Sequence, residues 1–116
     1  MAMPYRKRGR KFLYRPKHPL AAGNGKVLEY RAVLYEAIGP GPHHCVWCGD
    51  PIEWEASRGH GVSWTALVVD HLDGDMHNNT RDNLAPSCNE CNTLRGKVLD
   101  WEARRGIPIE TMLRRP

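Results

Sequence analysis

The chain has little with which to build a large apolar core. Among its 116 residues there is one phenylalanine, and aromatic residues make up 8%. No apolar run reaches the roughly eighteen residues of a membrane-spanning helix, and the basic N-terminal stretch is not followed by the apolar segment of a secretory signal. The length suits one domain, and small domains with thin cores are usually held together by disulfides or a metal. We therefore expect a soluble, cytoplasmic protein without a membrane partner.

Cysteine is sparse as well, but its spacing is regular. The four cysteines form two C-x-x-C pairs, Cys45-Val-Trp-Cys48 and Cys88-Asn-Glu-Cys91. Outside the secretory route such pairs favour metal ligation over disulfides, and both sulfurs of a pair can reach one tetrahedral ion at about 2.3 Å. The sequence therefore predicts one structural Zn2+ on all four. Four reduced core cysteines, or disulfides formed on oxidation, are the alternatives. Four thiolates close the coordination sphere, so we expect the chemistry elsewhere.

Acidic residues are missing from the first part of the chain. Residues 1–25 carry a net charge of +7, residues 26–91 of −6 and residues 92–116 of +3. Basic ends favour a polyanion such as DNA, while an acidic middle suits bound cations. We expect residues 1–25 to be a flexible arm whose cations contact phosphates and whose aromatic rings stack on bases. A disordered, solubilising terminus is the alternative. The arm's proposed DNA contacts are Arg6, Lys7, Arg8, Arg10 and Lys11.

The apolar pattern predicts a few short elements. A helix is expected over residues 26–38, capped by Asn24 and ended by Gly39. A buried strand is expected over residues 62–71, a loop over residues 72–82 and a short strand from Leu84 to Pro86. Ser87 and Glu90 have capping-box spacing, which predicts a second helix from about residue 89 to residue 99 or beyond. Residues 100–116 are expected to form a basic tail, and the four tryptophans to fill the core.

Polar residues lie between and beside the cysteine pairs in a specific order. Val69-Asp70-His71-Leu72 is followed by Arg81-Asp82-Asn83-Leu84 and then by Cys88-Asn89-Glu90-Cys91-Asn92. This order resembles the motif of HNH endonucleases, in the zinc-containing version whose two C-x-x-C pairs staple a ββα-metal (His-Me finger) unit. The likeness covers residues 43–96, and the chain is also similar to small HNH proteins encoded by bacteriophages.

The resemblance implies a role for each motif residue. His71 matches the general base, Asp70 one ligand of a catalytic divalent ion, and Asn92 the other ligand. Asn83 matches the middle residue that braces the loop between the two strands. The chain has Asn where many members have a second His, so it is an H-N-N variant. Arg95 and Lys97 follow Asn92 on the predicted helix, and we expect them to contact DNA phosphates, with Arg95 the better placed.

The residue chemistry supports the same assignment independently. A histidine with a pKa near 6.5 is partly neutral at pH 7 and can accept a proton from water. Carboxylate and amide oxygens favour a hard cation, so Mg2+ or Mn2+ is expected on Asp70 and Asn92, whereas a histidine at position 92 would favour softer metals. Taken singly, each residue also suits an ordinary turn or helix. Their joint spacing within a zinc frame favours a site.

These points lead to one set of expectations. We expect an α+β fold, with an arm over residues 1–25 and one nuclease domain over residues 26–116. Its ββα-metal core would span about residues 62–99, with a helix before it and basic extensions at both ends. The expected activity is metal-dependent hydrolysis of DNA by a monomer, which favours nicking, with a role in phage DNA processing or packaging. The alternatives are a non-catalytic zinc-finger DNA-binding module and an accessory subunit that depends on a packaging protein.

Overall fold

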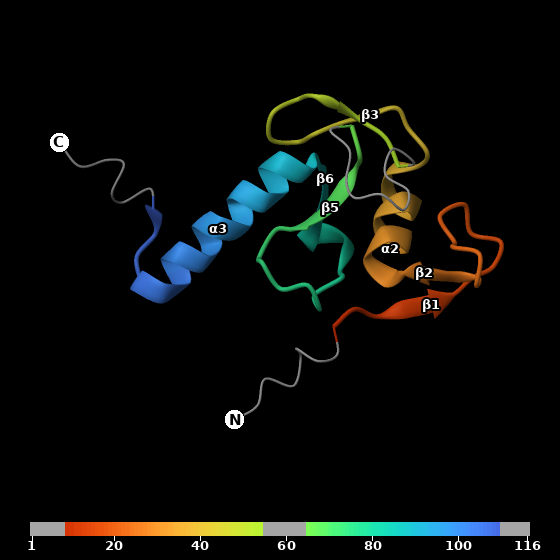
Figure 1. Ribbon diagram of the computed structural model, residues 1–116, viewed down its shortest axis with the longest axis horizontal. Helices are drawn as coiled ribbons and strands as arrows, with labels where there is room; N and C mark the ends of the chain where they lie inside the picture. Colours follow the sequence, from red (N-terminus) through yellow and green to blue (C-terminus); the bar gives the residue numbers. More distant parts are fainter. Residues whose placement is uncertain (1–8, 55–64, 110–116) are drawn as a thin grey trace.

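The described part of the chain folds into two helices and three short pairs of antiparallel strands. The structure, a computed structural model, describes residues 9–54 and 65–109. Its elements are, in order, β1 (Phe12–Tyr14), β2 (Lys26–Leu28), α2 (Glu29–Ile38), β3 (His43–His44), β4 (Pro51–Ile52), β5 (Val68–His71), the 3-10 turn η1 (Arg81–Asn83), β6 (Leu84–Ser87) and α3 (Asn89–Arg105). The strands pair as β1–β2, β3–β4 and β5–β6 (Figure 1). The prediction of an α+β fold is confirmed.

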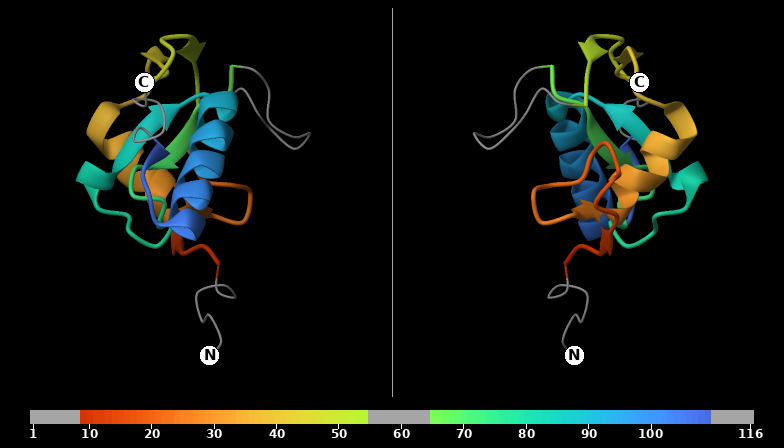
Figure 2. Two further views of the ribbon diagram at one scale, coloured as in Figure 1. Left: turned by 90° about the vertical axis from the view of Figure 1, so that its left-hand side faces the viewer. Right: turned by 90° about the vertical axis from the view of Figure 1, so that its right-hand side faces the viewer.

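The β5–β6 hairpin lies at the centre, with a helix on each side. Val68 pairs with Ser87 and His71 with Leu84, so the two strands are antiparallel over their full length. Both helices contact β5, and α2 also packs on β6 (Figures 1 and 2). The buried core joins Val69 and Leu84 of this hairpin to residues of α2 and of the segments around β2 and β4. This arrangement places the end of β5, where Asp70 and His71 lie, beside the start of α3.

The N-terminal segment is more ordered than the sequence analysis expected. Residues 12–14 pair with residues 26–28, so a hairpin replaces both the second half of the expected arm and the first turn of the expected helix. Leu13 packs against the core and Val27 is buried. Val27 misled the prediction because it fits two patterns. It alternates with its strand neighbours, and it also lies three residues before Tyr30, as on a helix. Residues 1–8, with Arg6, Lys7 and Arg8, lie outside the described part.

The two ends of the first helix, α2, are capped in different ways. Its N-cap position is Leu28, which offers no side-chain cap, while Asn24 Oδ1 instead accepts from Lys26 N at 3.0 Å in the preceding turn. The expected Asn24 cap is therefore wrong, because the strand intervenes. The expected stop at Gly39 is confirmed. Gly39 takes φ 78°, and its N–H donates to Tyr35 O at 2.7 Å.

The second helix starts on a cysteine and not on the expected capping box. Cys88 is the N-cap, and its Sγ accepts from Cys91 N at 3.3 Å. The Ser87 hydroxyl donates to Cys88 O at 2.8 Å and so does not reach the helix, which corrects the Ser87–Glu90 prediction. The helix continues through Gly96 to Arg105, where Gly106 ends it with φ 74°. No residue of α3 is buried, so the helix rests on β5 by one side only.

The tryptophans do not share one role. Trp54 is buried and donates to Gly39 O at 3.0 Å, as a core residue should. Trp101 is half-buried on α3, and Trp64 lies outside the described residues. Trp47 is 47% exposed, which contradicts the prediction that it fills the core. Within residues 9–54 and 65–109, no helix has both the length and the apolar character needed to cross a membrane.

Candidate functional site: a four-cysteine metal centre beside a polar pocket

The four cysteines meet at one point of the fold. Their Sγ atoms all lie within 4.8 Å of one another, and Cys48 Sγ is 3.9 Å from Cys88 Sγ. A tetrahedral zinc with bonds of about 2.3 Å separates its sulfurs by about 3.8 Å, so the cluster needs only a slight contraction around the ion. The cluster can therefore hold a structural metal such as zinc, as the cysteine spacing predicted. His44, beside Cys45, is exposed and belongs to no such cluster.

Local backbone geometry brings the two pairs together. Cys45 and Cys48 belong to a tight turn after β3, closed by Gly49 N donating to Cys45 O at 2.9 Å. Val46 N then donates to Pro86 O at 3.1 Å, which fastens this turn to β6. Cys88 and Cys91 follow β6 directly, at the first turn of α3. The centre thus joins the β3–β4 turn, β6 and α3, which are up to about 40 residues apart in the chain.

The surroundings of the cluster lower the pKa of one thiol, that of Cys45, and raise those of Cys48 and Cys91. Burial raises the pKa of the Cys45 thiol, but hydrogen bonds from the backbone N–H groups of Cys48, Cys88 and Trp47 outweigh this effect and lower the pKa from 9.0 to about 6. The hydrogen bond with the Cys88 sulfur and burial raise the pKa of Cys91 instead. Several thiolates at this separation repel each other unless a cation lies among them, so a metal would stabilise the cluster.

A polar pocket lies between β5 and α3, close to the cysteine cluster. Its volume is about 190 Å³, and it brings together three of the four predicted motif residues, Asp70, His71 and Asn92. The remaining lining is small or apolar and comes from Val69, Gly74, Met76, Gly96 and Leu99. The end of β5 supplies Asp70 and His71, while Asn92 comes from the first turns of α3. The pocket therefore collects one carboxylate, one imidazole and one amide from residues up to 22 positions apart.

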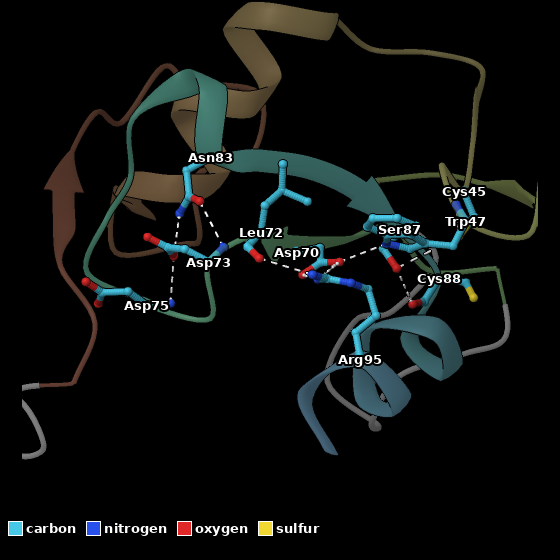
Figure 3. Close-up of polar contacts among 10 residues, drawn as sticks. All are labelled: Cys45, Trp47, Asp70, Leu72, Asp73, Asp75, Asn83, Ser87, Cys88 and Arg95. Carbon is cyan, nitrogen blue, oxygen red and sulfur yellow. Dashed lines mark hydrogen bonds and ion pairs between the residues drawn. The ribbon is translucent and has the colours of Figure 1, made fainter. Parts of the chain in front are cut away.

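The Asp70 carboxylate is buried and already has three hydrogen bonds. It is 3% exposed, and Arg95 Nη1 donates to both of its oxygens at 2.8 Å. Trp47 Nε1 donates to Oδ2 at 2.8 Å, and the Arg95 guanidinium stacks 4.6 Å from the Trp47 ring (Figure 3). Arg95 also donates to Leu72 O at 3.1 Å. Arg95 therefore points inward to Asp70, and the expected contact of this residue with DNA phosphate stays a prediction.

The His71 imidazole is held from the other side by α2 and the loop. His71 Nε2 lies 2.8 Å from Asn79 Oδ1, while Asn79 Nδ2 donates to Glu29 Oε1 at 3.0 Å. Because a carboxylate only accepts, the Asn79 amide nitrogen must face Glu29 and its oxygen must face His71. Nε2 then carries the imidazole proton, and Nδ1 is the basic nitrogen. Tyr30 packs edge-on against the His71 ring at 4.9 Å.

Asn83 holds the loop between β5 and β6 in shape. Its Oδ1 accepts from Asp73 N at 3.0 Å, and its Nδ2 donates to Asp73 Oδ1 at 2.9 Å (Figure 3). Nδ2 also donates to Asn78 O at 2.9 Å. Hydrogen bonds from the Asn78 side chain, the Asp75 backbone and the Asn83 side chain hold the pKa of Asp73 below 3.8. Asn83 thus lies outside the pocket and connects both ends of the loop.

The residues proposed to contact DNA lie in different parts of the fold. Arg10 is exposed beside the β1–β2 hairpin, and Lys97 is exposed on α3. Lys11 forms an ion pair with Glu29 at 3.5 Å, and so adjoins the Glu29–Asn79–His71 chain.

Sequence analysis missed three residues that orient the motif side chains, namely Trp47, Asn79 and Glu29. Asn79 and Glu29 are 50 positions apart, and no local pattern connects them.

The chain was compared with known proteins in three ways. No family model, no curated protein and no solved structure matches it.

Proposed function

We propose that the protein is a metal-dependent DNA endonuclease of the HNH type, in which β5, β6 and α3 act as a ββα-metal unit. The observation that carries the proposal is the convergence of Asp70, His71 and Asn92 on one pocket beside the cysteine cluster. A zinc ion on the four thiolates would hold the β3–β4 turn to α3 and would keep this pocket in shape. The motif order and the pocket geometry are independent supports, because the first is read from the chain and the second from the fold.

The reaction would be hydrolysis of a phosphodiester bond with His71 as the general base. A water oxygen attacks the phosphorus, its proton passes to His71 Nδ1, and the P–O3′ bond breaks with the electron pair leaving on the 3′ oxygen. That oxygen gains a proton from solvent, which leaves 3′-hydroxyl and 5′-phosphate ends. The hydrogen bond from Nε2 to Asn79 supports this role, because it keeps the proton away from Nδ1 and stabilises the imidazolium that forms.

The donor set of the pocket fits a hard divalent cation. A carboxylate offers about four acceptor positions, and Arg95 and Trp47 use three at Asp70. One position remains on Oδ1, and Asn92 lines the same pocket. Asp70 and Asn92 would therefore hold Mg2+ or Mn2+, which when bound neutralises charge on the phosphate and on the leaving oxygen. Arg95 supplies positive charge at the same carboxylate through the protein itself.

A supercoiled-plasmid assay tests the proposal. Wild type, His71→Ala and the control His44→Ala are compared with Mg2+, Mn2+, Ni2+ and Zn2+ added in turn, and without added metal. We expect nicking with Mg2+ or Mn2+ by wild type and His44→Ala, and none by His71→Ala, although all three bind zinc and melt at similar temperatures. Equal cutting by His71→Ala, purified free of contaminating nuclease, would contradict the assignment of the base.

One observation favours a second function, a zinc-stapled DNA-binding module without catalysis. The pairing of Asp70 with Arg95 and Trp47 is also what a purely structural buried ion pair would show. In that case the plasmid would shift on a gel with every metal but would never be nicked. A role in phage DNA processing or packaging is part of the main proposal and rests on the resemblance to phage HNH proteins. Activity that appears only when a packaging protein is added would support the accessory-subunit version.

A further inference from the structure

The β1–β2 hairpin exposes aromatic rings that a small core would be expected to use. Phe12, the only phenylalanine of the chain, is 53% exposed, and Tyr14 is 70% exposed. The register explains this placement, because Leu13 and Val27 face the core as a pair, and the alternate residues Phe12 and Tyr14 must then face outward. A protein with 8% aromatic residues thus has two of them on the outer face of one three-residue strand.

The Tyr14 ring is held in place by the turn beneath it. A Cβ atom at Gly25 would lie 2.6 Å from Tyr14 Cε1 and 3.3 Å from Cδ1, so the ring covers this glycine closely. Gly25 itself is buried and adopts φ 80°, and its carbonyl accepts from Arg15 N at 2.8 Å. The ring therefore rests on ordered backbone on one side and meets solvent on the other. Such a ring is oriented before any partner arrives.

The charged residues of the hairpin and its turn are all basic. Residues 9–28 contain no acidic residue and five basic ones, which are all exposed: Arg10, Lys11, Arg15, Lys17 and Lys26. Lys26 pairs directly with Tyr14 across the hairpin. Lys11 forms an ion pair with Glu29, the first residue of α2. The surface of Phe12, Tyr14 and Lys26, here called the hairpin face, therefore complements a partner with both flat apolar groups and negative charge.

The spacing of the rings selects the form of that partner. Side chains two residues apart on one strand face are about 6.7 Å apart along the strand. Bases that stay stacked in a duplex lie face to face at a rise of about 3.4 Å, so their faces are covered and neither ring can stack on them unless the bases are first unstacked. A strand whose bases are spread apart can place one base on each ring, and base–aromatic stacking of this kind does not depend on sequence.

We propose that the hairpin face binds unpaired nucleotides of a DNA strand, with Phe12 and Tyr14 stacking on bases and Lys26 and its basic neighbours contacting phosphates. This inference rests on the proposed nuclease function and deepens it, because it names the substrate as DNA with a single-stranded stretch. A duplex would engage the cations alone. The binding itself needs neither His71 nor the metal pocket, so the two proposals can fail separately.

Binding of labelled DNA to the His71→Ala protein, without added Mg2+ or Mn2+, provides the test. The probes are a 20-nucleotide oligothymidine and a blunt duplex of the same length, measured by fluorescence anisotropy at one fixed salt concentration. We expect Phe12→Ala with Tyr14→Ala to weaken single-strand binding by roughly tenfold or more for the two rings together, and to change duplex binding by less than about twofold. The matched control, Phe12→Tyr with Tyr14→Phe, keeps both rings and should keep the affinity.

Two further variants make the result decisive. Lys26→Gln removes a phosphate contact and should weaken both probes to a similar extent. Phe12→Leu with Tyr14→Leu keeps an apolar strand and replaces the alanine pair if that pair fails to fold, as judged by zinc content and melting. Unchanged single-strand affinity in a folded ring-less variant would overturn the inference, as would an equal loss for the duplex. If the ring-less variant loses single-strand binding and the wild-type protein does not cut DNA, the inference about the hairpin face stands and only the nuclease proposal is overturned.

Discussion

Arg95 Nη1 lies 2.8 Å from each carboxylate oxygen of Asp70, and this contact connects α3 to the end of β5. Trp47, from the turn that carries the first cysteine pair, donates to the same carboxylate and stacks on the same guanidinium. The cysteine centre and the polar pocket therefore share a boundary. A metal on Asp70 would have to share the carboxylate with an internal cation, so Arg95 should affect both stability and metal affinity.

Arg95→Ala should separate these two effects. It leaves a buried carboxylate with Trp47 as its remaining donor, and we expect the free energy of unfolding to fall by about 3 kcal/mol. Because Asp70 is then open, Mn2+ should raise the melting temperature of Arg95→Ala more than that of wild type. Arg104→Ala is the control, because Arg104 pairs with Asp100 at 3.0 Å on the exposed side of the same helix. Its loss should cost about 0.5 kcal/mol. Equal Mn2+ shifts in all three proteins would argue against metal binding at Asp70.

Zinc should be part of the folded protein. We expect one zinc per chain by native mass spectrometry, and a large loss of melting temperature on its removal by a strong chelator, because the metal joins segments that are distant in the chain. Cys88→Ser should lose zinc and unfold or aggregate. His44→Ala alters a residue next to Cys45 but outside the cluster, and should keep both zinc and stability. An unchanged melting temperature after metal removal would contradict the structural role.

Asn79 should act on catalysis through His71. Asn79→Ala removes the acceptor at Nε2, so the neutral imidazole loses its preference for a proton there, and we expect nicking to slow by roughly tenfold with zinc content and melting preserved. The 15N chemical shifts of the His71 ring report the proton position directly: Nε2-protonated in wild type and a mixture in the variant. Asp82→Ala, an exposed change in the same segment, is the control. A wild-type ring protonated at Nδ1 would refute this orientation.

Asn83 should matter for folding more than for chemistry. Asn83→Ala removes three hydrogen bonds and leaves Asp73 N and Asn78 O without this partner. Because Asn83 is itself buried, we expect a loss of about 2 kcal/mol in denaturant unfolding of the zinc-loaded protein. Faster amide exchange across residues 73–83 should accompany it. The exposed Asn89→Ala serves for comparison, and a similar small effect from both variants would show that the loop does not depend on Asn83.

Local rules predicted the elements whose patterns had one interpretation. The Gly39 stop, the strand that ends at Asp70 and His71, and the helix that begins at the second cysteine pair follow from short-range preferences, and the structure contains all three. The rules failed where one residue satisfied two patterns. Val27 fits a strand and a helix, and pairing with Leu13 decided for the strand. Ser87 fits a capping box, but the thiol of Cys88 took the N-cap.

The sequence alone determined which groups the protein has for chemistry: four thiols in two pairs, and Asp70, His71, Asn83 and Asn92 in a set order. Spacing of two residues constrains ligand geometry directly, so the cysteine cluster could be predicted from the chain. Only the tertiary structure decided how the other groups are held. The contacts of Asp70 with Trp47 and Arg95, and of His71 with Asn79, join residues brought together by packing of β5 between two helices. No local pattern encodes such contacts, because they depend on the relative placement of elements that are distant in the chain.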